Sequence, residues 1–448
     1  MHAELPTIAR HGATVLAGQL AVMAFGVTDT IIAGRYSPEA LAALSIGSAV
    51  FVSVYVALNG VLQALLPVWA EQRGAHAQAA IGASVRQSLY LWALASLLGM
   101  VALLSPSAIL RWTEVPEALR AQVQLYLAIL AWGLPPALAF RLYSTLSQSL
   151  GQPQFVTWLQ LGALALKLPL SIWFTFGGAG LPPQAAPGCA WATLLVNYAL
   201  LLPAWFMLRR HPMYAPLALW RTLERPDLAQ LARLVRLGLP AGLSILVEVT
   251  SFTLMALFIA RQGALASSAH QIAANLAAVL YMAPLSLAIA VSARVSFWRG
   301  AGDEARAAAV ARLGLRLAAV VGTALASLLW LFKSSLASLY THSAEVIALT
   351  TGLLTWVAAY HVADALQTLS IFVLRSYHIT FAPLVIYSLM LWGAGLAGGY
   401  TLAYRGLWGW PALDSPTPFW GASALALALV ALVFSALLTG VLRLRRAA

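Results

Sequence analysis

Long apolar runs alternate with short polar segments along the whole chain. A helix needs about 20 mainly apolar residues to cross ~30 Å of hydrocarbon. Twelve runs meet that length, with expected bounds 8–34, 40–69, 84–104, 120–145, 155–176, 187–208, 231–260, 266–293, 307–332, 346–374, 381–404 and 418–442. The pattern therefore predicts an all-α integral membrane protein with twelve transmembrane helices.

Composition supports this prediction. Of the 448 residues, 61% are hydrophobic and only 9% are charged, whereas soluble domains carry about 25% charged residues. So few charges cannot cover a water-facing surface of this size, and the apolar side chains must face lipid. The single cysteine, Cys189, excludes an internal disulfide and a cysteine-rich metal site.

The distribution of basic residues predicts an orientation. Of the 26 Lys and Arg residues, nineteen lie at the N-terminal end, in or next to the even-numbered loops, or in the C-terminal tail, and six lie in or next to the odd-numbered loops. Cytoplasmic loops of membrane proteins collect Lys and Arg. We therefore expect both termini in the cytoplasm, and we attribute the net charge of +12 to this rule rather than to nucleic-acid binding.

The two halves of the chain repeat at an offset of 226 residues. Arg10 and Gly12 correspond to Arg236 and Gly238, and the triplet Arg73-Gly74-Ala75 corresponds to Arg299-Gly300-Ala301. The alternative is chance matching in helices rich in Ala, Leu and Gly. The repeat predicts two lobes, 1–225 and 226–448, each with six helices, that are related by parallel topology. Membrane transporters are commonly built from such repeats and bind their substrate between them.

Four charged residues lie well inside predicted spans, away from their ends: Asp29, Lys167, Glu248 and Asp364. A charge at the bilayer centre costs at least ~2.5 kcal/mol, so these residues are candidates for function. At 1.5 Å per residue, Glu248 lies roughly 20 Å from the outer end of its helix and Asp364 roughly 16 Å from the inner end of its own. The alternative is that the acidic residues form ion pairs that only hold helices together.

Glu248 and Asp364 have hydroxyl neighbours on their own helices. Ser244 and Ser251 lie at i−4 and i+3 from Glu248, and Tyr360 lies at i−4 from Asp364. Two carboxylates with hydroxyl groups suit a proton or Na⁺. We expect a possible Na⁺ at Glu248 and Asp364, no other metal and no cofactor.

Missing motifs narrow the function further. The chain has no G-x-x-x-x-G-K-[ST] phosphate loop, no H-E-x-x-H metal motif and no soluble segment long enough for a catalytic domain. An ion gradient would then supply the energy, and we expect a transporter rather than an enzyme or a membrane scaffold.

Four segments resemble the multidrug and toxic compound extrusion (MATE) family, in order and over nearly the whole chain. They are Gly26-Val27-Thr28-Asp29-Thr30; Leu239-Pro240-Ala241 leading to Glu248; Ala269-His270-Gln271-Ile272 with Tyr281-Met282-Ala283-Pro284-Leu285; and Asp364-Ala365-Leu366-Gln367. The combination of Glu248 and Asp364 is similar to the NorM-type branch.

The resemblance implies a V-shaped pair of six-helix bundles that exports cationic amphiphilic compounds against Na⁺ or H⁺ by alternating access. It implies a cation site in the C-terminal lobe at Glu248, Asp364 and Tyr360. Further possible cavity-lining residues are Gln271, Tyr281, Ser171, Ser244 and Ser251. We expect a monomer in the lipid bilayer of a bacterial inner membrane. The alternative function is a flippase for lipid-linked precursors, which usually needs a more basic cavity than this chain offers.

The fifth span departs from the family pattern. Many relatives carry Asn-x-Pro-x-Asn where this chain has Lys167-Leu168-Pro169-Leu170-Ser171. We hypothesise that Lys167 pairs with Asp29, because each charge alone is costly inside the membrane. The alternative is that the Lys167 side chain extends to a membrane interface.

Overall fold

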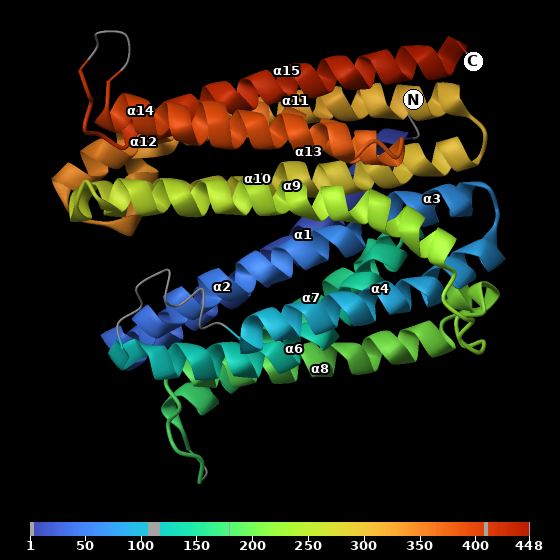
Figure 1. The fold of residues 1–448 in the computed structure, drawn as a ribbon, viewed down its shortest axis with the longest axis horizontal. Coiled ribbons are helices and arrows are strands. Elements are labelled where there is room, and N and C mark those ends of the chain that lie inside the picture. The colour runs from blue at the N-terminus through green and yellow to red at the C-terminus, as the bar shows by residue number, and fades with distance from the viewer. Residues whose placement is uncertain (1–3, 106–116, 179, 407–410, 448) are drawn as a thin grey trace. The chain divides into compact units, whose positions relative to one another are not determined.

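The computed structural model describes residues 4–105, 117–178, 180–406 and 411–447, and helices account for nearly all of them (Figure 1). The α-helices are α1 (Glu4–Tyr36), α2 (Pro38–Gln63), α3 (Leu66–Gly74), α4 (Gln78–Leu104), α6 (Glu117–Ser149), α7 (Pro153–Phe176), α8 (Ala186–Arg210), α9 (Leu228–Ala260), α10 (Ala264–Gly300), α11 (Glu304–Tyr340), α12 (Ala344–Ser376), α13 (Phe381–Ser388), α14 (Gly398–Tyr404) and α15 (Thr417–Ala447). A 3₁₀ turn, η1 (Pro212–Leu217), and a π-helix, η2 (Leu389–Ala397), complete the described elements.

Twelve helical segments in the described residues are long and apolar enough to cross a membrane, which confirms the predicted number. α2 and α3 together form one of these spans, and α13, η2 and α14 form another. Several helices extend beyond the predicted apolar runs because polar side chains cap their first turns. Ser37 accepts a hydrogen bond from the Ala40 amide at 3.1 Å, and Asp303 accepts one from the Arg306 amide at 2.8 Å.

The helices form two compact units, each with its own apolar core. The N-unit comprises Ala17–Gly242, in which α2, α4, α6, α7 and α8 pack along one another. The C-unit comprises Met1–Leu16 together with Leu243–Ala448, in which α10, α11, α12 and α15 pack along one another. The unit boundaries lie inside α1 and α9, and the lobe boundary after residue 225 stays a prediction.

The first turns of α1 and of α9 pack at equivalent positions of the repeat. A Cβ added to Gly12 would lie 3.8 Å from the Leu287 Cα on α10, and one added to Gly238 would lie 2.8 Å from the Val61 carbonyl oxygen on α2. Both pairs, Gly12 with Gly238 and Val61 with Leu287, are related by the 226-residue offset. The two crossings are therefore repeats of one another, and they explain why the first turns of α1 belong to the C-unit.

The repeated Arg-Gly-Ala triplets also play equivalent roles. In the N-unit, Arg73 Nη1 donates to the Ser149 carbonyl at 3.3 Å, at the end of α6. In the C-unit, Arg299 Nη1 donates to the Ser376 carbonyl at the end of α12. Each arginine satisfies a carbonyl at a helix C-terminus that has no partner within the helix. The structure thus confirms the parallel repeat that the sequence predicts.

The segment between α8 and α9 packs against α4. Arg86 donates to Glu224 Oε1 at 2.5 Å and to the Ala218 carbonyl at 2.8 Å. The hydrogen bond from Arg86 holds the pKa of Glu224 below its usual range. Gln87 binds the same segment through the Arg225 carbonyl and the Asp227 amide.

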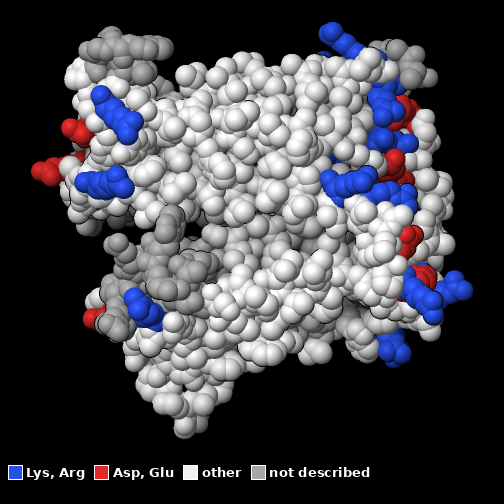
Figure 2. Space-filling view, viewed as in Figure 1, with Lys and Arg blue, Asp and Glu red and all other residues white. Residues whose placement is uncertain are grey.

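Charged side chains gather at the ends of the helices, and the visible surface between the ends is almost free of charge (Figure 2). In the C-unit, one end carries Arg294, Arg299, Arg306 and Arg443. There Glu4 binds Arg294 at 2.8 Å and Arg306 at 3.3 Å. The uncharged band is the surface expected to face hydrocarbon.

Candidate ion-coupling sites

Asp364 lies in the middle of α12, and its side chain is held by its own helix. The residue is 2% exposed, and its Oδ1 accepts hydrogen bonds from Gln367 Nε2 at 2.9 Å and from Thr368 Oγ1 at 3.4 Å. Gln367 Nε2 also lies 3.4 Å from the Tyr387 hydroxyl of α13. A carboxylate held by two donors is fixed in position while lone pairs remain for a further cation or proton.

Glu248 on α9 lies beside a cavity of about 10 Å³, close to the volume that holds one water molecule. Ser251 and Tyr360 supply further polar groups to the lining, together with Phe252, Met255, Leu391 and Ser423. The charge of Asp364 on α12 also acts on Glu248. The structure therefore brings together Glu248, Asp364, Tyr360 and Ser251, which the sequence assigned to one site.

The other residues predicted for the C-unit differ in how they lie with respect to Glu248 and Asp364. Tyr281 on α10 interacts with Thr368 and lies in the field of both carboxylates. Ser244 is buried on α9 but is not among the residues that line the small cavity. Gln271 is exposed on α10. Its neighbour His270 is 3% exposed and packs on the Trp420 ring, with 5.8 Å between ring centroids.

Four residues in or near this site were not assigned to it from the sequence, although Gln367 belongs to one of the segments that resemble the family. Gln367 and Thr368 follow Asp364 at i+3 and i+4, on the same helix face, and that spacing could have identified them. Tyr387 belongs to α13, and no local pattern links it to α12. Arg375 directly follows the predicted run 346–374, where a basic residue usually marks the membrane interface, yet it is 3% exposed.

In the N-unit, Lys167 of α7 and Asp29 of α1 form an ion pair. Lys167 Nζ lies 2.8 Å from Asp29 Oδ1 and 2.9 Å from Oδ2. The lysine is 0% exposed, which excludes the alternative that its side chain extends to a membrane interface. Lys167 Nζ also donates to the Thr193 hydroxyl at 2.6 Å and the Cys189 carbonyl at 3.1 Å.

Ser171 completes this cluster by donating to Asp29 Oδ1 at 3.0 Å. One carboxylate and one ammonium group therefore face each other in a fully hydrogen-bonded setting, and their charges sum to zero. The cluster leaves no uncompensated negative charge to attract a cation.

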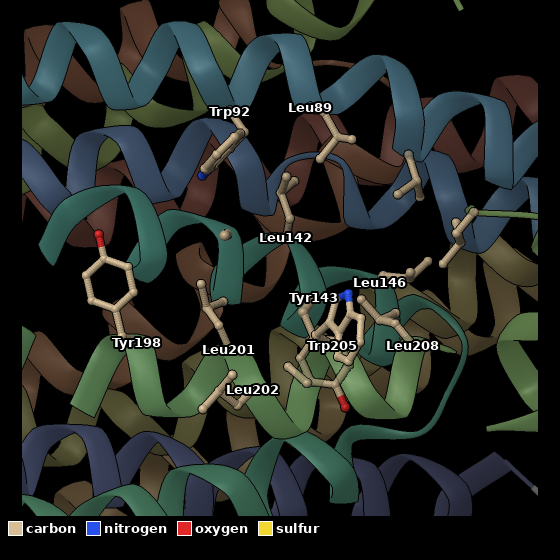
Figure 3. Close-up of a pocket in the computed structure, with 14 residues that line it drawn as sticks. Leu89, Trp92, Leu142, Tyr143, Leu146, Tyr198, Leu201, Leu202, Trp205 and Leu208 are labelled. Carbon is tan, nitrogen blue, oxygen red and sulfur yellow. The ribbon is translucent and has the colours of Figure 1, made fainter. Parts of the chain in front are cut away.

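A larger cavity of about 460 Å³ lies between α4, α6 and α8 in the N-unit (Figure 3). Its lining is almost entirely apolar and includes Leu89, Trp92, Leu142, Leu201 and Trp205. It contains none of the predicted site residues. The residues that line this larger cavity include no charged group that could bind an ion.

Comparison with known proteins identifies the family to which the chain belongs. The MatE family model matches residues 15–173 and again residues 240–401, once in each repeat. The chain is 36% identical over 436 residues to the probable multidrug resistance protein NorM of Aromatoleum aromaticum, covering 97% of this chain and 93% of the relative. It is 33% identical over 401 residues to the probable multidrug resistance protein NorM of Chromobacterium violaceum, and that match covers 89% of this chain and 86% of the relative.

Solved structures show the same fold. One is described as the outward-facing conformation of a multidrug resistance MATE family transporter of the MOP superfamily. It matches with a TM-score of 0.88 at 16% identity and covers 99% of this chain and 96% of that one. At this identity the match concerns the fold alone.

Proposed function

Because the chain belongs to the MatE family of multidrug and toxic compound extrusion transporters, we propose that it exports amphiphilic organic cations in exchange for Na⁺ or H⁺. Glu248 and Asp364 are the coupling groups, with Tyr360 beside them. The observation that carries this proposal is the carboxylate of Glu248, which lines a cavity of about 10 Å³ and interacts electrostatically with Asp364. That volume suits a single small ion or water molecule.

Exchange follows from the cost of uncompensated charge. A carboxylate away from water is strongly disfavoured unless a proton or a cation compensates it. The coupling ion and a cationic substrate can each compensate the negative charge of the carboxylates. Once one of them is bound, the other is no longer needed for that compensation. Binding of one therefore favours release of the other, which is the thermodynamic requirement for antiport.

A lipid-linked precursor is the less favoured cargo. Such a substrate carries negative phosphate groups, whereas the candidate coupling site presents the carboxylates of Glu248 and Asp364. The named relatives are multidrug resistance proteins. Both observations support a cationic substrate.

The proposal is tested with purified full-length protein in proteoliposomes. Ethidium efflux is measured after a sudden change of Na⁺ concentration and, separately, after a sudden change of pH. We expect Glu248→Gln and Asp364→Asn each to reduce ion-coupled efflux by at least tenfold. The response of the unmodified protein to the two jumps identifies the coupling ion.

Glu345→Gln is the matched control, because Glu345 is an exposed glutamate in the first turn of α12. It should transport like the unmodified protein. If Glu248→Gln and Asp364→Asn both retain full ion-coupled efflux, the carboxylates are not the coupling groups.

We further propose that the chain lies in the inner membrane of a bacterium with both termini in the cytoplasm. The twelve apolar helices make it a multi-pass membrane protein, and the asymmetry of its basic residues supports this orientation.

A further inference from the structure

The apolar cavity between α4, α6 and α8 of the N-unit is a groove that opens at the surface of the unit (Figure 3). Its volume is about 460 Å³. Three of the residues that line it, Leu89, Tyr198 and Leu202, are 41%, 47% and 71% exposed. Apolar side chains that are exposed on membrane-spanning helices face hydrocarbon. The groove is therefore accessible to molecules of the lipid phase.

The length of this groove matches one leaflet of the bilayer. It follows α8 from Tyr198 to Leu208, which is roughly 15 Å at 1.5 Å per residue. The hydrocarbon core is ~30 Å thick, so the groove covers about half of it. The groove ends at Leu208, directly before Arg209 and Arg210 in the last turn of α8. A single acyl chain is apolar along its whole length, as the lining is, and extends through one leaflet.

Two indole rings hold the Arg209 guanidinium at this end of the groove. Trp205 lines the groove and packs edge-to-face against Trp220, with 6.1 Å between the ring centroids. The Arg209 Cζ atom lies 5.3 Å from the centroid of the Trp205 ring and 5.7 Å from that of Trp220. Trp220 is itself fixed, because its Nε1 donates to the Leu208 carbonyl at 3.3 Å. The contacts with both rings stabilise one position of the cation.

The charge of Arg209 selects the kind of molecule that fits. Arg209 is exposed and forms no ion pair among the residues that the structure describes. Glu224, on the segment that follows α8, is already bound by Arg86 at 2.5 Å. A guanidinium binds a phosphate through two parallel N–H groups. The same charge repels a cationic amphiphile, so the groove suits an anionic lipid better than the substrates proposed above.

We propose that this groove is a binding site for an anionic phospholipid, with one acyl chain between α4, α6 and α8 and the phosphate group at Arg209. The phosphate then lies at the end of α8 that we assign to the cytoplasm. Basic pockets between transmembrane helices bind anionic headgroups at that face of a membrane. A lipid that binds only the folded N-unit also stabilises it by mass action. This inference does not depend on the carboxylates of the C-unit.

The test measures lipid binding to the purified full-length protein by native mass spectrometry. The probes are dioleoylphosphatidylglycerol and dioleoylphosphatidylethanolamine, which share their acyl chains and differ in headgroup charge. We expect one phosphatidylglycerol to bind more tightly than phosphatidylethanolamine. Arg209→Gln should weaken phosphatidylglycerol binding roughly fivefold, the effect of one basic side chain near an anionic headgroup. Arg210→Gln is the matched control, because Arg210 lies over Phe206, whose ring does not line the groove.

A further variant tests the acyl chain separately from the headgroup. Ala139 of α6 lines the groove, so Ala139→Phe should place a ring in it and abolish the tight phosphatidylglycerol binding while Arg209 stays in place. Three results would overturn the inference: equal affinity of the unmodified protein for the two lipids, equal losses in Arg209→Gln and Arg210→Gln, and unchanged binding by Ala139→Phe. The two arginine variants decide the matter if Ala139→Phe does not fold, because both arginines are exposed.

Discussion

At the scale of single residues, the buried pair of Lys167 and Asp29 predicts strong coupling between two positions 138 apart in the chain. Removing one partner of a buried ion pair costs about 3–5 kcal/mol, because the other charge is left unpaired, whereas removing both can be nearly neutral. We expect Lys167→Met and Asp29→Asn each to lower the thermal stability of the purified protein. The double variant should recover much of the loss.

A double-mutant cycle measures this coupling directly. Ser171→Ala is a suitable reference, because it removes one hydrogen bond to Asp29 and should cost about 1 kcal/mol. Additive losses in the two charge variants, with no recovery in the double variant, would show that the pair does not stabilise the fold.

These residues also show how far sequence reasoning reaches. The cost of charge inside the membrane was enough to select Asp29, Lys167, Glu248 and Asp364, because it applies to any single ionisable residue in an apolar run. The burial of Arg375 escaped this reasoning. It stands at the end of its run, where a basic residue usually marks the interface, yet it is 3% exposed on a helix along which α10, α11 and α15 pack.

At the scale of helices, α9 makes its closest approach to α2 through Gly238 and Gly242. An added Cβ would lie 2.8 Å from the Val61 carbonyl oxygen at the first position and 2.5 Å from the Ala57 carbonyl oxygen at the second. Backbone atoms cannot move aside as a flexible side chain can. We expect Gly242→Ala to destabilise the protein by about 1–3 kcal/mol, the usual cost of overpacking, measured as a fall in thermal unfolding temperature.

Gly440→Ala is the matched control, since nothing lies within 4 Å of a Cβ at Gly440 of α15. Alanine is the better helix former, so this change should be neutral or slightly stabilising. If Gly242→Ala and Gly440→Ala change the unfolding temperature equally, then α9 and α2 can move apart at their crossing without loss of stability.

The helices were predictable in number but not in their ends or their irregularities. The length of an apolar run reflects the thickness of the hydrocarbon core, whereas the ends of a helix depend on capping groups such as Ser37 and Asp303. The π-helix of Leu389–Ala397 was not predicted. π-helical segments are rare, and the apolar sequence of this run does not distinguish one from an α-helix.

At the scale of the whole molecule, the asymmetric distribution of basic residues predicts which end of each helix faces the cytoplasm. The chain suits a direct test of this orientation, because its one native cysteine, Cys189, is 0% exposed. A single cysteine can therefore be added without first removing any. Arg443 and Arg261 are exposed at the ends of α15 and α9 that we assign to the cytoplasm and to the outer side.

Arg261→Cys should react with a membrane-impermeant maleimide in intact cells, because its end of α9 is expected to face outward. Arg443→Cys should react only after the inner membrane is permeabilised. The unmodified protein should remain unlabelled in both conditions, since Cys189 lies buried between α7 and α1 against Thr175 and the Asp29 carbonyl. The reverse pattern would place both termini outside. The direction of exchange would stay the same, because the ion gradient and not the orientation of the protein sets it.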